Sequence, residues 1–220
     1  MTELFPDGIL TERLRLVRES VADADLGERY ESMNEDAIED GELAYVPIEP
    51  FEHLQDAREY VAGREGRMQS VDAGTYVVRP RDGEDGAHEP AGEAELFAIW
   101  DERTAFMTFG LRKQFWGRGY SGERAAAFLR LAFERLDLEL VSVTHLVGNG
   151  TARRAIEKCV DRYVGRRVGR FRNQHVIDGE PCDVVRYEIA RTDYEESSER
   201  TDCEFVEDAG EEREDRRESR

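Results

Sequence analysis

Residues 114–122 read QFWGRGYSG, and they join an apolar segment, Thr104 to Leu111, to a segment with a helical pattern. Gly117 and Gly119 stand one residue apart, so the backbone there can approach a ligand without a Cβ in the way. The first amides of a helix have no partner within the helix, and its dipole adds partial positive charge at that end. The stretch therefore suits a phosphate or pyrophosphate group, although two glycines also occur in plain strand-to-helix turns.

Gly117, Gly119 and Gly122 also spell the G-x-G-x-x-G fingerprint of dinucleotide-binding proteins. That fingerprint requires a buried parallel strand before it and an Asp or Glu about 20 residues on, at the end of the next strand. Here the next predicted strand ends near Leu146 without a carboxylate, and the segment before the loop follows a hairpin. The sequence therefore disfavours a dinucleotide site.

The same residues carry a resemblance to the GNAT superfamily of N-acetyltransferases. The pyrophosphate loop of that superfamily has the pattern Gln/Arg-x-x-Gly-x-Gly/Ala, which Gln114, Gly117 and Gly119 match. The stretch 115–121 resembles the ribosomal-protein N-acetyltransferase branch (RimJ/RimL-like). The resemblance extends from residues 10–16 to residues 183–187, which is nearly all of the chain before its acidic end.

Hydrophobic periodicity predicts strands near residues 14–17, 75–79, 92–100, 104–111, 140–146, 171–176 and 183–190, and helices near 21–33 and 51–64, after the glycine loop and after residue 149. Ser20 is the predicted N-cap of the first helix, and Leu43 to Val46 form a short apolar piece between loops. Short connections predict antiparallel neighbours, whereas a crossover helix makes 104–111 and 140–146 parallel. The predicted fold class is mixed α/β (α+β), with a central, mostly antiparallel sheet, one parallel pair and helices on both faces.

The composition limits the classes of partner. The formal net charge of −19 disfavours nucleic acid, because phosphates would be repelled. Lys113 and Lys158 are the only lysines, and excess carboxylate with few lysines resembles proteins of halophilic organisms, although an ordinary acidic protein fits too. The three cysteines and four histidines show neither a disulfide framework nor metal-ligand spacing. With no leader or membrane-spanning segment expected, the predicted location is cytoplasmic.

Two regions are expected. Residues 1–192 form one N-acetyltransferase-like domain, and residues 193–220 form an acidic tail. The last 28 residues hold 13 acids and 5 arginines, with Phe205 and Val206 as the only apolar pair. Such a segment buries too little to offset its ordering entropy, so it is expected to be disordered.

The resemblance implies acetyl-CoA as co-substrate and no metal. It places the pantetheine arm on the free backbone of the 104–111 strand, up to Leu111. It places the pyrophosphate on the amides of the loop, with Gln114 at its start; the loop amides are those of Gly117, Arg118, Gly119, Tyr120 and Ser121. The Arg118 side chain either adds charge near a phosphate or is solvated. Asn149 contacts the arm, caps a helix or does both. Arg153 either reaches the phosphates or faces solvent.

The usual acid and base positions of the superfamily hold residues that do not titrate, namely Phe106, Ala152 and Ile156. Tyr163 is about 20 Å of helix away from Asn149 and is a poor substitute for the missing acid. The remaining candidate bases are Glu95 first, Glu93 second and His145 third. Each also has a plain structural interpretation, and water can carry out both proton transfers.

The predicted function is transfer of an acetyl group from acetyl-CoA to a primary amine, either a protein N-terminus or a small amine. The alternative is a non-catalytic acyl-CoA-binding module of the same fold. The expected partners are acetyl-CoA and the amine acceptor, with no nucleic acid and no membrane. The expected state is a monomer or homodimer.

Overall fold

The computed structural model describes residues 4–19, 24–38, 51–71, 73–177, 179–199 and 201–207. Its centre is one sheet in which the described strands follow the order β7-β8-β6-β5-β4-β3-β2-β1-β9. The strands are β1 (Gly8–Leu10), β2 (Leu14–Arg18), β3 (Ala73–Pro80), β4 (Gly92–Ile99), β5 (Thr104–Leu111), β6 (Leu140–Leu146), β7 (Arg166–Ile177), β8 (Glu180–Ala190) and β9 (Glu204–Val206). All neighbours are antiparallel except β5 and β6, which are parallel. The predicted class of fold is therefore confirmed.

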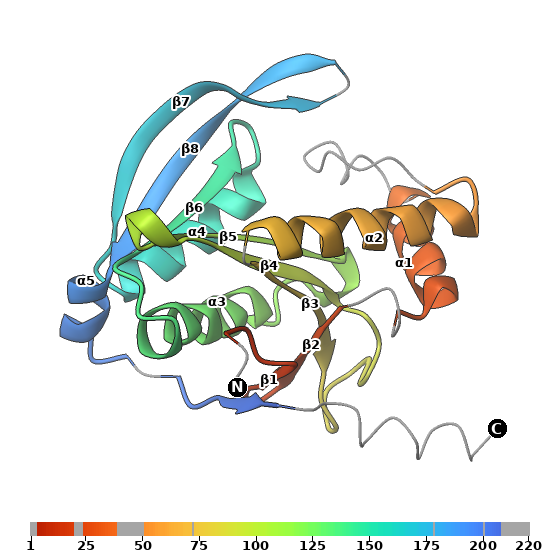
Figure 1. Cartoon of the computed structure of the whole chain (residues 1–220), viewed down its shortest axis with the longest axis horizontal. Coiled ribbons are helices and arrows are strands. Elements are labelled where there is room, and N and C mark those ends of the chain that lie inside the picture. The colour runs from red at the N-terminus through yellow and green to blue at the C-terminus, as the bar shows by residue number, and fades with distance from the viewer. Residues whose placement is uncertain are drawn as a thin grey trace.

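Helices cover both faces of the sheet (Figure 1). They are α1 (Leu26–Ile38), α2 (Leu54–Val71), α3 (Tyr120–Arg130), α4 (Gly150–Arg162) and α5 (Arg191–Glu196), with short turns η2 (Trp100–Glu102), η3 (Lys113–Phe115) and η4 (Leu131–Arg135). Helices α1 and α2 lie on one face, whereas α3 and α4 lie on the other. The β7–β8 hairpin arches away at one end of the sheet (Figure 1).

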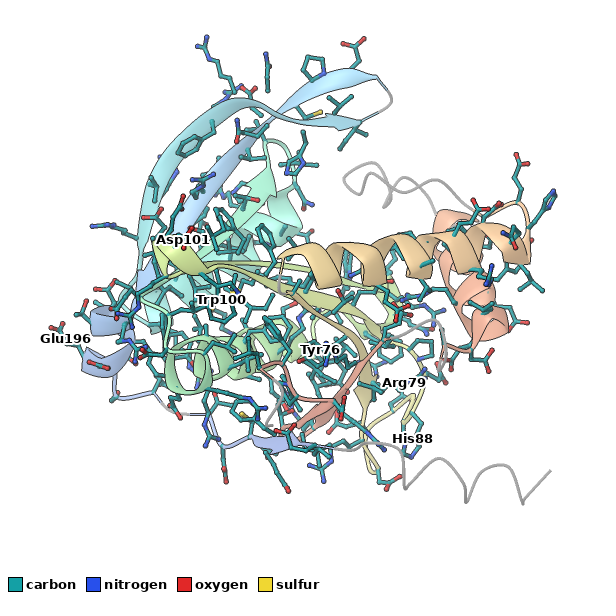
Figure 2. All side chains as sticks on the ribbon, viewed as in Figure 1. Tyr76, Arg79, His88, Trp100, Asp101 and Glu196 are labelled. Atoms are coloured by element: carbon teal, nitrogen blue, oxygen red, sulfur yellow. The ribbon has the colours of Figure 1, made fainter. Side chains whose placement is uncertain are left out.

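The core fills the space between the sheet and α3. Tyr76 of β3 is fully buried at its centre, where its ring lies 5.8 Å from that of Phe128 on α3 (Figure 2). The Tyr76 hydroxyl donates to the Pro6 carbonyl at 3.0 Å, so the one polar atom of this ring is satisfied. At the β3–β4 hairpin, Arg79 donates to the carbonyl of its neighbour His88 at 2.6 Å (Figure 2).

The first two helices differ from their predicted bounds. Helix α1 begins at Leu26 because Asp25 accepts a hydrogen bond from the Glu28 amide at 3.0 Å and so acts as its cap. The predicted cap, Ser20, and the short apolar piece 43–46 lie outside the described residues. Helix α2 continues to Val71, seven residues beyond its predicted end at Arg64.

The prediction of a disordered tail from residue 193 is wrong for residues 193–199 and 201–207. Helix α5 follows β8 directly, and β9 pairs with β1 in the register Ile9–Phe205. We call residues 191–199 and 201–207 the C-terminal strap, which runs from one end of the sheet to the other (Figure 1). Two arginines hold the strap in place through contacts that a count of apolar residues does not include. Arg130 donates to the Cys203 carbonyl, and the guanidinium of Arg135 lies 5.5 Å from the centre of the Phe205 ring. Residues 208–220 lie outside the described part.

Candidate functional site

Strands β5 and β6 pair only along their first halves. Their ladder starts at Thr104–Leu140 and ends at Met107–Val143, although β5 stays paired with β4, and β6 with β8, to their last residues. The two strands therefore diverge, and a cleft of about 1480 Å³ lies along residues 108–111 and 144–146. A diverged strand offers backbone groups that no neighbouring strand uses on that side.

The glycine loop lies at the mouth of this cleft. Gly117 and Gly119 have φ values of +77° and +83°, a region that favours glycine. Gly119 is the N-cap of α3 and makes no side-chain capping bond, so the first amides of α3 depend on other partners. A Cβ on Gly117 would meet no protein atom within 4 Å. The loop thus presents open backbone and the positive end of a helix dipole to the cleft, as an anion site requires.

The residues just before the glycines connect the loop to β5. The Trp116 indole donates to the Leu111 carbonyl at 2.7 Å, and Gln114 reaches Glu89 at 3.4 Å. Trp116 also lines the cleft and is 40% exposed. The Leu111 carbonyl is therefore already used within the protein, as is the Gly110 carbonyl, which accepts a hydrogen bond from Arg124 at 3.2 Å.

The predicted loop arginine points away from the cleft. Arg118 donates to the Asp85 carbonyl at 2.7 Å and pairs with its carboxylate at 3.0 Å, so its charge is held on the β3–β4 hairpin. Arg13 lies in the wall of the cleft instead and donates to the Arg118 carbonyl at 2.8 Å while it pairs with Glu123 at 2.7 Å. Arg13 braces the loop and brings a cation beside it.

Tyr120 and Ser121 both line the cleft at the first turn of α3. The Tyr120 hydroxyl donates to Glu84 at 2.6 Å, which anchors the start of the helix to the β3–β4 hairpin. Burial, together with this carboxylate, raises the pKa of Tyr120 above its ordinary value. The ring therefore has an anchoring role, and only the backbone amide remains for a ligand.

Asn149 caps α4, because its Oδ1 accepts a hydrogen bond from the Ala152 amide at 2.9 Å. It also lines the cleft. Arg153 has a side chain that is 60% exposed, pairs with Glu157 at 3.4 Å and is not in the cleft wall. Its neighbour Arg154 is in the wall and turns back to Thr151 at 3.3 Å. Of the two arginines, the geometry favours Arg154 as the one that can meet an anion.

The cleft differs in charge from the rest of the molecule. Its wall contains eight arginines and lysines and five carboxylates, although the chain carries a formal net charge of −19. The basic residues of the wall are Arg13, Arg29, Arg64, Arg112, Arg124, Arg154, Lys158 and Arg162. A locally basic cleft on an acidic protein concentrates anionic ligands there.

Glu93 is engaged by two arginines. Its carboxylate pairs with Arg29 of α1 and Arg64 of α2 and accepts a hydrogen bond from Tyr60 at 3.0 Å. Burial raises the pKa of Glu93, but Arg29 and then Arg64 outweigh it, so the pKa is lowered below its ordinary value. A carboxylate held in this way is a weak base, and its geometry suits tying α1 and α2 to β4.

Glu95 is better placed for proton transfer. It faces Thr108 across the β4–β5 ladder, and Thr108 is the first residue of β5 beyond its pairing with β6. Its carboxylate pairs with Arg64 at 3.2 Å, and the side chain is 19% exposed in the cleft wall. Glu95 thus lies beside the point at which the cleft begins, with part of its carboxylate accessible.

His145 lies on the opposite face of the sheet from Glu93 and Glu95, because side chains alternate along paired strands. It is buried, its Nδ1 donates to the Leu146 carbonyl at 2.9 Å, and its Nε2 lies 3.5 Å from the Tyr187 hydroxyl. Such a histidine can act only from the α4 side of the cleft.

The positions that lack titrating groups are packed. The Phe106 ring stacks on that of Phe97 with centroids 5.1 Å apart, and Ile156 is buried. Tyr163 is also buried, at the far end of α4 from Asn149. Burial raises the pKa of Tyr163, which suits a core residue.

The sequence analysis missed several residues of the cleft wall, among them Arg13, Tyr60, Arg64 and Arg124. Arg13 directly precedes β2, Tyr60 and Arg64 lie on α2, and Arg124 lies on α3. The sequence motifs assign no role to any of the four. For Arg124 the sequence does contain a signal, because this charged residue stands on the apolar face of a predicted helix, four residues before Phe128.

Among the described residues, no group of three or more His, Cys, Asp or Glu side chains is arranged to hold a metal ion. None of the helices in the described part of the chain is long and apolar enough to cross a membrane.

Comparison with known proteins identifies the family to which the sequence is similar. The family model of the acetyltransferase (GNAT) domain matches residues 13–159. No curated protein matches the sequence.

Several solved structures share the fold. An acetyltransferase of the GNAT family from Bacillus anthracis is 22% identical with a TM-score of 0.65, over 84% of this chain and 99% of that chain. A microcin self-immunity acetyltransferase, solved with acetyl-CoA and AMP, is 15% identical with a TM-score of 0.71, over 86% and 98%. Spermidine N-acetyltransferase from Vibrio cholerae, solved with CoA and spermine, is 20% identical with a TM-score of 0.62, over 82% and 97%. At these identities the likeness concerns the fold.

Proposed function

Because the chain belongs to the acetyltransferase (GNAT) family, we propose that it transfers an acetyl group from acetyl-CoA to a primary amine in the cleft between β5 and β6. One observation carries the proposal: β5 and β6 diverge after Met107 and Val143, directly beside a glycine loop at the start of α3. Diverging parallel strands next to an anion site suit a ligand that is both elongated and phosphorylated.

The residues present fit acetyl-CoA. The amides of residues 117–121 would hold the pyrophosphate, with Arg13 and Arg154 as nearby cations. The backbone of residues 108–110 and the side chain of Asn149 would hold the pantetheine arm. Gly117 and Gly119 have no side chains to block this path, and their positive φ values favour glycine at both positions. The co-substrate supplies a thioester as acetyl donor.

We assign the base role to Glu95. A primary amine must lose a proton to attack, and an α-amine has an unperturbed pKa of about 8, so little basicity is required. Glu95 would hold that proton directly or through one water, and the backbone amides of the diverged part of β5 would stabilise the developing oxyanion. Glu93 and His145 remain secondary candidates, since the first is neutralised by two arginines and the second is buried on the other face.

We propose either a protein N-terminus, as in the RimJ/RimL-like branch, or a small amine as the acceptor. We further propose a cytoplasmic protein that works at high ionic strength, on the basis of its formal net charge of −19 and its two lysines. The alternative function, a non-catalytic acyl-CoA-binding module, is favoured by the apolar residues Phe106 and Ile156 at two usual acid–base positions.

A panel of amines tests the proposal. Peptides with free N-termini, polyamines and amino acids are incubated in molar salt with the protein and acetyl-CoA, and free thiol is measured with and without each amine. We expect thiol release that depends on at least one amine and equals the acetylated product. Binding of acetyl-CoA without release for any amine class would favour the binding module instead.

A further inference from the structure

Arg124 is a fully buried arginine without a carboxylate partner among the described residues. It lies on the second turn of α3 and is 0% exposed. Its Nη1 donates to the carbonyls of Glu93 and Gly110 at 3.3 and 3.2 Å, and its guanidinium lies 4.1 Å from the centre of the Phe109 ring. Its Nε and Nη2 have no hydrogen-bond partner within the described part of the chain.

The other buried arginines of the site differ from it, since Arg29 and Arg64 each pair with Glu93. Burial lowers the pKa of Arg124 to about 9, so the guanidinium still carries its charge near neutral pH. An unpaired buried charge costs folding free energy, whereas a hydrophobic side chain of similar size at the same place is often neutral or stabilising. Stability therefore does not explain why a cation occupies this position.

Arg124 lies close to the two elements that line the proposed acetyl-CoA site, the start of α3 and the diverged half of β5. It belongs to the wall of the cleft, and it follows Tyr120, the first residue of α3, by four residues, or about 6 Å of helix rise. The Gly110 carbonyl that it contacts belongs to the diverged half of β5. Arg124 thus lies between the two elements to which we assign the phosphates and the arm of the co-substrate.

We propose that Arg124 is a positioning residue that provides a buried positive charge for the phosphate groups of an acyl-CoA. The inference rests on the proposed function only in taking an acyl-CoA as the ligand. In a site of effective dielectric about 20, a unit charge on the order of 10 Å from a phosphate changes a binding constant by about tenfold. The cost of burying the cation is then offset when the anionic ligand binds.

The test compares a phosphorylated ligand with an unphosphorylated one. Arg124→Met replaces the cation with an apolar chain, and Arg124→Lys keeps a charge. Binding of acetyl-CoA and of S-acetyl-pantetheine, which lacks the phosphates, is followed by the fluorescence of Trp116, which lines the cleft. We expect Arg124→Met to weaken acetyl-CoA binding about tenfold or more, to change S-acetyl-pantetheine binding less than about threefold, and to leave Tm unchanged or higher. Arg124→Lys should recover part of the loss.

The salt dependence of acetyl-CoA binding provides a second readout that a purely structural role would not change. Loss of one cation should make the slope of log Kd against log salt concentration shallower for Arg124→Met. Arg130→Met is the matched control, because Arg130 is on the same helix but ties α3 to the C-terminal strap through Cys203. It should lower Tm and leave the ratio of the two affinities unchanged.

The outcomes are separable. If the parent protein does not bind acetyl-CoA, the proposed function falls. If the parent binds but Arg124→Met binds acetyl-CoA as tightly and with the same salt slope, only this inference is overturned. An equal loss for both ligands, together with a lower Tm, would make Arg124 a structural residue and would also overturn it.

Discussion

Replacement of Gly119 by valine tests the phosphate-binding loop. Gly119 has φ +83°, and a Cβ there would lie 3.3 Å from Nη2 of Arg13. A β-branched residue in this region costs about 1–3 kcal/mol, so the backbone would rotate toward an ordinary conformation or push Arg13 aside. Either change redirects the first amides of α3. Two charge-assisted hydrogen bonds of about 1.5–3 kcal/mol each would be weakened, which predicts acetyl-CoA binding at least about a hundredfold weaker.

Calorimetry of acetyl-CoA binding measures this loss, and Gly83→Val controls for it. Gly83 has φ +91° in the β3–β4 hairpin, a Cβ there meets nothing within 4 Å, and it does not line the cleft. The control variant carries the same kind of backbone strain and should bind acetyl-CoA as the parent does. Parent-like affinity in Gly119→Val, or an equal loss in both variants, would refute the assignment of the loop.

Three further results are expected. Truncation after Thr192 should lower Tm by about 5–15 °C, because it removes the β1–β9 pairing and the Phe205 contacts, whereas truncation after Glu207 should leave Tm unchanged. The same Tm in both truncated proteins would show that the C-terminal strap does not stabilise the fold. Glu95→Gln should reduce kcat/KM by at most about a hundredfold with Tm unchanged. Glu93→Gln should cost about 3–5 kcal/mol of stability, because it leaves two buried arginines without their carboxylate partner. Since the pKa of Glu93 is lowered in the folded protein, the parent should keep this stability above the unfolded-state pKa and lose it as pH falls through the folded-state pKa, which is checked by measuring Tm at decreasing pH. Tm should rise steeply from low to molar salt, because screening shortens from about 10 Å at 0.1 M to about 3 Å at 1 M around a chain of formal net charge −19, and a flat response would contradict that reasoning.

The part of the fold that the sequence predicted best is the part with strong local signals. The bounds of β5 and β6 match the predicted strands 104–111 and 140–146, and their parallel pairing followed from the crossover helix between them. The glycine loop was predicted because Gly117 and Gly119 stand one residue apart between a strand pattern and an amphipathic helix. Periodicity and turn chemistry are local properties, so one sequence suffices to read them.

What the sequence did not predict depends on contacts between distant residues. The pairing of β9 with β1 rests on arginine contacts to Phe205 and Cys203, which no count of apolar residues in the strap could reveal. The order Glu95 before Glu93 was predicted, but its physical reason was not, because Arg29 and Arg64 reach Glu93 from two different helices. The loop cation comes from Arg13, more than one hundred positions before Gly119, and not from Arg118 within the loop.

Hydrogen–deuterium exchange with and without acetyl-CoA tests the central claim most directly, because it reports which backbone amides the ligand covers. We predict protection confined to the diverged half of β5 (residues 108–111) and to the loop 117–121, with no change in β9. Binding of acetyl-CoA with unchanged exchange in both of these segments would place the ligand elsewhere and contradict the assignment of the cleft.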